Sequence, residues 1–162
     1  MKYLIDFLYL LYLLFLTTPK QYRLLETEEM RVYPFSDHRY FWWCGIIFHH
    51  GDLEKWGRDK QRWAHLNIHL YQARRYLTWT SFYASYIWQF LIGSIVCRSF
   101  KAGFYTSPYE FEAYQKEENN YYLQDYDEKN IEKYWYPFRE RRLFWKRSGK
   151  NKEGWMNFIK NF

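Results

Sequence analysis

The chain has 162 residues and a formal net charge of +6 at pH 7, and 9 Trp, 18 Tyr and 14 Phe make a quarter of it aromatic. Aromatic side chains in this number favour subunit interfaces and the membrane–water boundary over the core of a solitary domain. The sequence contains no glycine-rich phosphate loop, nucleophile elbow or catalytic triad, and Cys44 and Cys97 argue for neither a disulfide nor a cysteine-ligated metal. The composition therefore predicts a protein that is not an enzyme and has no small-molecule substrate.

The first apolar run, residues 3–18, is interrupted only by Asp6. Together with Lys2 it is similar to the apolar core of a secretory signal peptide, but no small-x-small cleavage pattern follows it, which favours a retained membrane anchor over residues 1–18. Asp6 is either a proton-path residue or one that extends to the lipid headgroups. Its position near the end of the run favours the headgroups.

Residues 19–52 are predicted to form an interfacial segment. Its first part is polar, whereas residues 40–48 are apolar but too short to cross a bilayer. Trp42 and Trp43 in this run suit aromatic rings at headgroup depth. We therefore expect the segment to lie on the membrane surface or to be partly buried.

Residues 53–98 are predicted to form one long helix that changes from amphipathic to transmembrane. Residues 77–97 carry no charge, and 21 residues at 1.5 Å each cover the roughly 30 Å hydrocarbon core of a bilayer. The alternative is a long buried helix of a soluble domain. The helical seam before the span consists of Trp56, Trp63, Leu66, Leu70, Ala73 and Leu77.

Residues 99–162 are predicted to form an irregular, aromatic-rich tail of short helices and extended pieces outside the membrane. Residues 109–136 contain eight acids and three lysines, whereas residues 137–162 contain eight bases and two acids. Such blocks either wrap over partner subunits or stay solvated, and the many aromatic residues favour wrapping. The expected fold class is thus mainly α and membrane-anchored, with an N-terminal anchor helix, a long transmembrane helix and this tail.

Basic residues flank the predicted span and fill the end of the tail. Their number on the two sides of the span is equal, so the positive-inside rule does not decide the orientation. Next to a membrane anchor, such residues suit anionic phospholipid such as cardiolipin, or acidic partner proteins, better than nucleic acid. The predicted lipid- or partner-binding residues are Arg74, Arg75, Arg98, Lys101, Arg139, Arg141, Arg142, Lys146 and Arg147.

His65 and His69 are the candidates for a metal site, because residues four apart share one face of a helix. The HExxH pattern is absent and no third ligand follows from the sequence. Five histidines are also too few for the di-iron boxes of membrane desaturases. We therefore expect no metal and no cofactor, and histidines that bond to neighbours or lipid.

Residues encoded by AT-rich codons are more than twice as frequent as Gly, Ala, Arg and Pro, yet the chain contains nine Trp. This combination is consistent with a genetic code in which TGA also encodes Trp, as in most mitochondria. The lack of an Arg-rich, acid-poor presequence agrees with a protein that is made in the organelle or internally targeted. The predicted location is the mitochondrial inner membrane.

The plan of anchor, long helix and aromatic tail resembles accessory subunits of mitochondrial respiratory complexes, particularly those of protists. Trp56-Gly57-Arg58-Asp59, followed by Trp63, is similar to the W-G-R-N and nearby Trp of a small single-span subunit in the membrane arm of complex I. The resemblance implies a non-catalytic subunit that acts in assembly and stability, with complex I favoured over complex IV. The alternatives are an accessory subunit of the ATP synthase membrane part, a basic mitoribosomal protein and a membrane enzyme with a histidine-bound metal.

Overall fold

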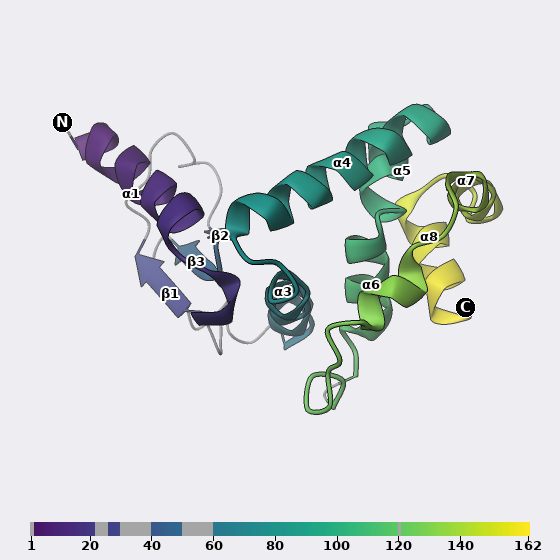
Figure 1. Cartoon of the computed structure of the whole chain (residues 1–162). Coiled ribbons are helices and arrows are strands. Elements are labelled where there is room, and N and C mark those ends of the chain that lie inside the picture. The colour runs from purple at the N-terminus through teal and green to yellow at the C-terminus, as the bar shows by residue number, and fades with distance from the viewer. Residues whose placement is uncertain (1, 22–25, 30–39, 50–59, 120) are drawn as a thin grey trace. The chain divides into compact units, whose positions relative to one another are not determined.

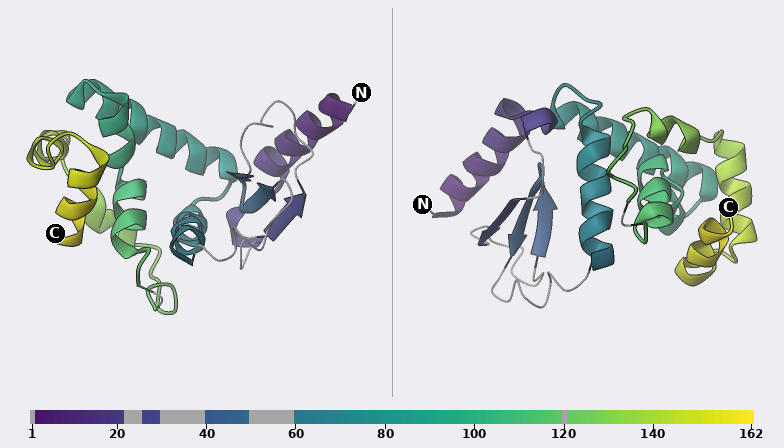
Figure 2. Two further views of the ribbon diagram at one scale, coloured as in Figure 1. Left: turned by 180° about the vertical axis from the view of Figure 1, so that it is seen from behind. Right: turned by 90° about the horizontal axis from the view of Figure 1, so that it is seen from below.

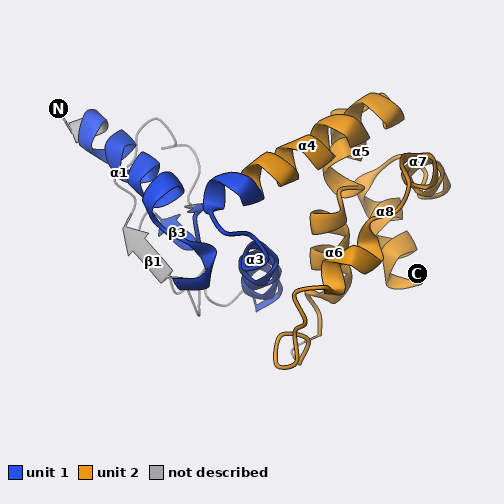
Figure 3. Cartoon of the chain, viewed as in Figure 1, with its two compact units in different colours: residues 1–82 blue, residues 83–162 orange. Residues whose placement is uncertain are grey.

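The computed structural model describes residues 2–21, 26–29, 40–49, 60–119 and 121–162. They form two compact units, residues 1–82 and 83–162, and the boundary falls within helix α4 (Trp79–Cys97) (Figure 3). The Trp56-Gly57-Arg58-Asp59 motif lies outside the described residues. Each unit has buried side chains of its own, so each is described by itself.

The first unit contains a three-stranded sheet in the order β1-β3-β2 (Figures 1 and 2). Strand β3 (Ile46–His49) pairs in parallel with β1 (Glu26–Glu29) and antiparallel with β2 (Tyr40–Trp43). Cys44 and Gly45 connect β2 to β3 with φ of 49° and 82°, the positive values that a two-residue hairpin turn needs. The apolar run 40–48 is thus a hairpin, an element that the predicted helical plan did not include.

Aromatic contacts tie the hairpin to the helices of the first unit. The ring centroid of Trp42 lies 6.0 Å from that of Trp79 and 6.3 Å from that of Phe82. Helix α1 (Lys2–Leu16), which is followed by a 3₁₀ turn at Pro19–Gln21, is held where Trp43 Nε1 donates a hydrogen bond of 3.1 Å to the carbonyl of Leu10. Helix α3 (Lys60–Ala73) adds further core residues. The core of this unit includes Ile46, Ile47, Phe48, Ile68, Leu70, Ala73, Trp79 and Phe82.

The prediction of one continuous helix through residues 53–98 is wrong. Helix α3 ends at Ala73, and α4 begins at Trp79. The amide of Ser81 donates to Thr78 Oγ1 over 3.2 Å, while the amide of Thr78 donates to Ser81 Oγ over 3.3 Å. This reciprocal pair is the arrangement of a capping box, so Thr78 starts a new helix where the sequence pattern favours continuation.

The predicted transmembrane span is also wrong. Among the described residues, none of the helices combines the length and the apolar character that crossing a bilayer requires. Helix α4 has 19 residues, and Gln89 together with several Ser and Thr residues lowers its mean hydropathy. Helix α1 is strongly apolar but has only 15 residues. The membrane-anchored fold class is therefore corrected to a mainly helical chain with one small sheet.

The second unit is helical: the short helices expected in the tail are present, but they pack around a core of their own instead of forming an irregular tail. Beyond α4 it contains α5 (Phe100–Tyr105), α6 (Pro108–Lys116), a 3₁₀ helix η3 (Asn130–Tyr134), α7 (Phe138–Arg147) and α8 (Lys152–Lys160) (Figure 1). Ser99 caps α5 and Asn151 caps α8 through their side-chain oxygens. The aromatic-rich core consists of Ala102, Phe111, Tyr134, Phe144, Trp145, Trp155 and Ile159.

Candidate functional site

Several polar side chains of helix α4 lie in the interior of the second unit. Gln89 and Ser94 are buried. Ser85 Oγ lies 2.6 Å from the hydroxyl oxygen of Tyr109, and the Tyr86 hydroxyl donates to a carboxylate oxygen of Glu110. Burial and the nearby Glu110 raise the pKa of Tyr86 well above its ordinary value, so this phenol stays protonated and remains a donor. The polar residues in the part of α4 that belongs to the second unit are therefore buried in it or hydrogen-bonded to it.

Arg141 of α7 makes hydrogen bonds to Gln89 in the interior of the second unit. Its Nη1 donates to Gln89 Oε1 over 2.8 Å and its Nη2 to the carbonyl of Gln89 over 3.1 Å. The residue is only 2% exposed, and within the part of the chain that the structure describes its Nε has no hydrogen-bond partner and it forms no ion pair. Burial lowers the pKa of Arg141 to about 10, so the guanidinium is charged at pH 7. Although it was predicted to bind lipid or a partner, Arg141 instead joins two helices of the unit.

Two glycines let the helices approach closely around this contact. A Cβ at Gly93 would lie 2.8 Å from Nη2 of Arg141 and 3.1 Å from the Cα of Gly103. A Cβ at Gly103 would lie 2.5 Å from the carbonyl oxygen of Phe90. Only hydrogen fits at these positions, so α4 and α5 pack backbone against backbone.

The opposite face of α4 carries large apolar side chains that the second unit does not bury. Ile87, Leu91 and Ile95 recur every four residues and Trp88 lies three residues before Leu91, which places these side chains in one stripe. Trp88 is 61% exposed and Ile95 is 75% exposed, values that are uncommon for such large apolar residues in a row. Phe100 at the start of α5 extends the same kind of surface. We call this surface the α4 outer face, and it consists of Ile87, Trp88, Leu91, Ile95 and Phe100.

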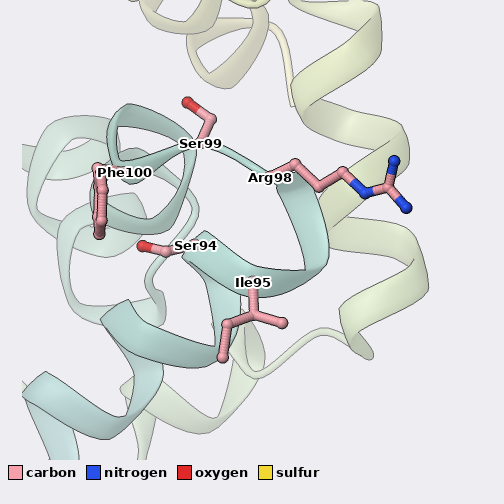
Figure 4. Close-up of a pocket in the computed structure, with 5 residues that line it drawn as sticks. All are labelled: Ser94, Ile95, Arg98, Ser99 and Phe100. Carbon is pink, nitrogen blue, oxygen red and sulfur yellow. The ribbon is translucent and has the colours of Figure 1, made fainter.

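An open pocket of about 260 Å³ lies at the end of the α4 outer face, where α4 turns into α5 (Figure 4). Figure 4 shows the Ser94 hydroxyl directed toward the Phe100 ring, whereas the Arg98 side chain extends away from that ring. The lining is mostly apolar, with one cation at the rim. Its residues are Ser94, Ile95, Arg98, Ser99 and Phe100.

Arg98 at this rim has a left-handed backbone conformation, with φ of 53°. It ends α4 in a Schellman motif, because the amide of Ser99 donates to the carbonyl of Ser94 and the amide of Arg98 to that of Ile95. Helix α7 ends in the same way, but there Gly149, with φ of 71°, occupies the left-handed position. A residue with a side chain is less stable than glycine in this conformation by about 1 kcal/mol, so Arg98 lowers the free energy of unfolding slightly.

The other predicted basic residues are distributed over both units. In the second unit, Lys101 of α5 is exposed. In the first unit, the guanidinium of Arg74 lies 4.0 Å above the ring of Tyr71, and Arg75 is exposed. Helix α7 carries four predicted cations that are all exposed, namely Arg139, Arg142, Lys146 and Arg147.

Helix α1 of the first unit has the same reversed polarity as α4: its polar side chain is buried and its apolar side chains are mostly exposed. Its one charged residue within the apolar run, Asp6, is buried, whereas most of its large apolar side chains are exposed. Leu16 at its end is 72% exposed. We call this surface the α1 outer face, and it consists of Leu4, Ile5, Phe7, Leu8, Tyr12, Phe15 and Leu16.

The predicted histidine pair is brought together on α3. The ring centroids of His65 and His69 lie 4.8 Å apart, as expected for residues one turn apart on one helix face. Sequence reasoning missed Gln72, which bonds to His69, and Gln89, which holds Arg141. A polar amide in an otherwise apolar helix was the available signal for Gln89.

No family model, curated protein or solved structure matches this chain in the comparisons with known proteins.

Proposed function

We propose that the chain is a non-catalytic accessory subunit of a large protein assembly of the mitochondrial inner membrane, a respiratory complex first and complex I before complex IV. The observation that supports this proposal is the reversed polarity of α4. Gln89 and Ser94 lie inside the unit, whereas Trp88, Leu91 and Ile95 lie outside. A helix that presents its apolar stripe outward gains stability when another apolar surface covers that stripe.

Burial of this face by a partner is favourable by roughly 25 cal/mol for each Å² of apolar surface removed from water. Trp is enriched among the residues that contribute most at subunit interfaces, and Trp88 is the aromatic residue of this stripe. The α1 outer face supplies a second surface of the same kind in the first unit. The role is thus to fill space between other subunits and to stabilise them.

The assignment to a respiratory complex rests on the sequence resemblance and on the amino-acid composition, and it requires a biochemical test. Mitochondria solubilised in a mild detergent are separated on a native gel, and the protein is located by mass spectrometry of the gel slices. We expect it to co-migrate with known complex I or complex IV subunits in a particle many times its own 20.6 kDa. Migration as a free monomer would contradict the proposal.

A basic mitoribosomal protein is the second candidate, because α7 displays several exposed cations. Arg139, Arg142 and Lys146 recur at spacings of three and four and therefore share a face of α7. Phosphate contacts weaken steeply with salt. Co-sedimentation with ribosomal RNA that disappears in high salt would favour this candidate, whereas an apolar subunit interface would survive the same wash.

A further inference from the structure

Two imidazole rings of α3 converge on one point in the first unit. Nε2 of His65 lies 3.1 Å from Nε2 of His69, and the ring planes are nearly perpendicular, at 81°. In the absence of an ion, one of these nitrogens donates a hydrogen bond to the other. The distance between the two nitrogens is therefore that of a hydrogen bond, in which one proton lies between them.

Gln72 fixes the orientation of one of these rings. Nδ1 of His69 lies 2.8 Å from Oε1 of Gln72, and both residues are buried. Because an amide oxygen only accepts, Nδ1 of His69 carries the proton and Nε2 presents its lone pair toward His65. In metal-binding histidines, the ring nitrogen that does not bind the metal commonly donates a hydrogen bond to an oxygen that is held in place.

We propose that Nε2 of His65 and Nε2 of His69 bind one divalent transition-metal ion of the zinc class, with Gln72 as the residue that positions His69. At zinc–nitrogen bond lengths of 2.0–2.1 Å, tetrahedral geometry places two ligand nitrogens about 3.3 Å apart, close to the distance in the structure. The ion takes the place of the proton between the two nitrogens, and that proton moves to Nδ1 of His65, so that both rings stay neutral and each presents an Nε2 lone pair.

The donor set decides which ions bind. Imidazole nitrogen suits Zn²⁺, Cu²⁺ and Ni²⁺, whereas Mg²⁺ and Ca²⁺ prefer oxygen ligands. The ion links two successive turns of α3, so its role is to stabilise this helix. The site is independent of the proposed subunit function, and either can fail without the other.

The test is a calorimetric titration of the metal-free full chain with ZnCl₂. We expect one Zn²⁺ per chain, no response to MgCl₂, and loss of the stoichiometric binding in His65→Ala and in His69→Gln. Gln72→Leu removes the oxygen that holds His69, and we expect the affinity to fall by about 10- to 100-fold. His49→Ala, in strand β3 of the same unit, is the matched control and should bind as the wild type does.

Circular dichroism shows whether each variant keeps its helices, and the wild type offers a second readout that needs no variant. Zn²⁺ should raise its melting temperature and shift the imidazole NMR signals of His65 and His69. Absence of stoichiometric binding to the wild type, or equal binding to His65→Ala and to the wild type, would overturn the proposal. Loss of binding in His49→Ala with full retention in both α3 variants would do so as well.

Discussion

Arg141 and Gln89 form a buried two-point contact in which the guanidinium binds both the side-chain and the main-chain oxygen of one residue, at 2.8 and 3.1 Å. The contact joins α7 to the middle of α4. Because the second unit uses the polar groups of α4 in this way, the apolar groups of the same helix are left on its surface. This relationship underlies the proposed role as an accessory subunit.

A double-mutant cycle measures the Arg141–Gln89 contact. Gln89→Leu leaves the buried guanidinium with one fewer acceptor, and Arg141→Met leaves a buried amide unpaired, so we expect each to lower the free energy of unfolding by about 1–3 kcal/mol. The double variant removes both polar partners and should cost less than the sum of the two. Urea unfolding measures all four chains, and additive effects would show that the contact contributes no coupling.

Gly103→Ala tests the close approach of α4 and α5. The added methyl group would lie 2.5 Å from the carbonyl oxygen of Phe90, which is backbone and cannot rotate away. Overpacking of this kind costs about 1–3 kcal/mol, so the urea midpoint should fall. Ala84→Ser, at an exposed position of α4, is the control and should leave the midpoint unchanged.

The sequence identified some of these features and not others, for reasons that particular residues explain. The charge-free run of α4 was recognised as a helix, because hydrophobic length is a strong signal. The start of α4 at Thr78 was not recognised, since a Thr-x-x-Ser capping pair inside a helical pattern competes weakly with that pattern. The hairpin at Cys44 and Gly45 was missed because a cysteine is an unusual residue for a left-handed turn position.

The candidate site was predicted only in part. Arg98 and Lys101 are exposed as expected, whereas Arg141 is buried although its neighbours Arg139 and Arg142 are exposed. Nothing local in the sequence separates Arg141 from these neighbours, because its burial depends on Gln89, 52 residues earlier. The prediction of a transmembrane span failed for a related reason: the run 77–97 carries no charge, but its polar residues such as Gln89 bond within the second unit.

Arg98→Gly tests whether Arg98 contributes to lipid binding and not to stability. Glycine adopts this backbone conformation without a steric cost, as Gly149 does at the end of α7, so we expect the free energy of unfolding to rise by about 0.5–1 kcal/mol. Co-sedimentation with vesicles that contain cardiolipin should weaken in the same variant if the cation contacts anionic lipid. Lys101→Gly at a right-handed helical position is the comparison, and it should lower stability.

Alkaline pH should destabilise the second unit through buried tyrosines. The Tyr122 hydroxyl donates to Glu112 Oε1 over 2.6 Å, and that of Tyr134 to Gln115 Oε1 over 2.8 Å. Burial and the neighbouring Glu112 raise the pKa of Tyr122, Tyr126 and Tyr134 above the ordinary value. Their contribution to stability is therefore complete below about pH 10, where the unfolded chain begins to lose these protons, and it decreases as the pH rises further.

Unfolding free energies measured between pH 8 and 11.5, values chosen to bracket the titration of an ordinary phenol at about 10, give the expected slope. Tyr122→Phe should make this slope shallower, because one of the raised groups is gone. Tyr121→Phe, which removes an exposed hydroxyl next to it, is the matched control. A stability that stays constant across this range would contradict the predicted linkage.

The most direct test of the accessory-subunit role compares Leu91→Lys with Leu143→Lys in native complexes. The two side chains are equally exposed, at 44% and 43%, but Leu91 belongs to the α4 outer face and Leu143 lies on α7. Tagged variants are expressed in mitochondria and purified in a mild detergent, and their partners are quantified by mass spectrometry. The proposal predicts that Leu91→Lys loses most co-purified subunits while Leu143→Lys retains them, and equal recovery with both variants would contradict it.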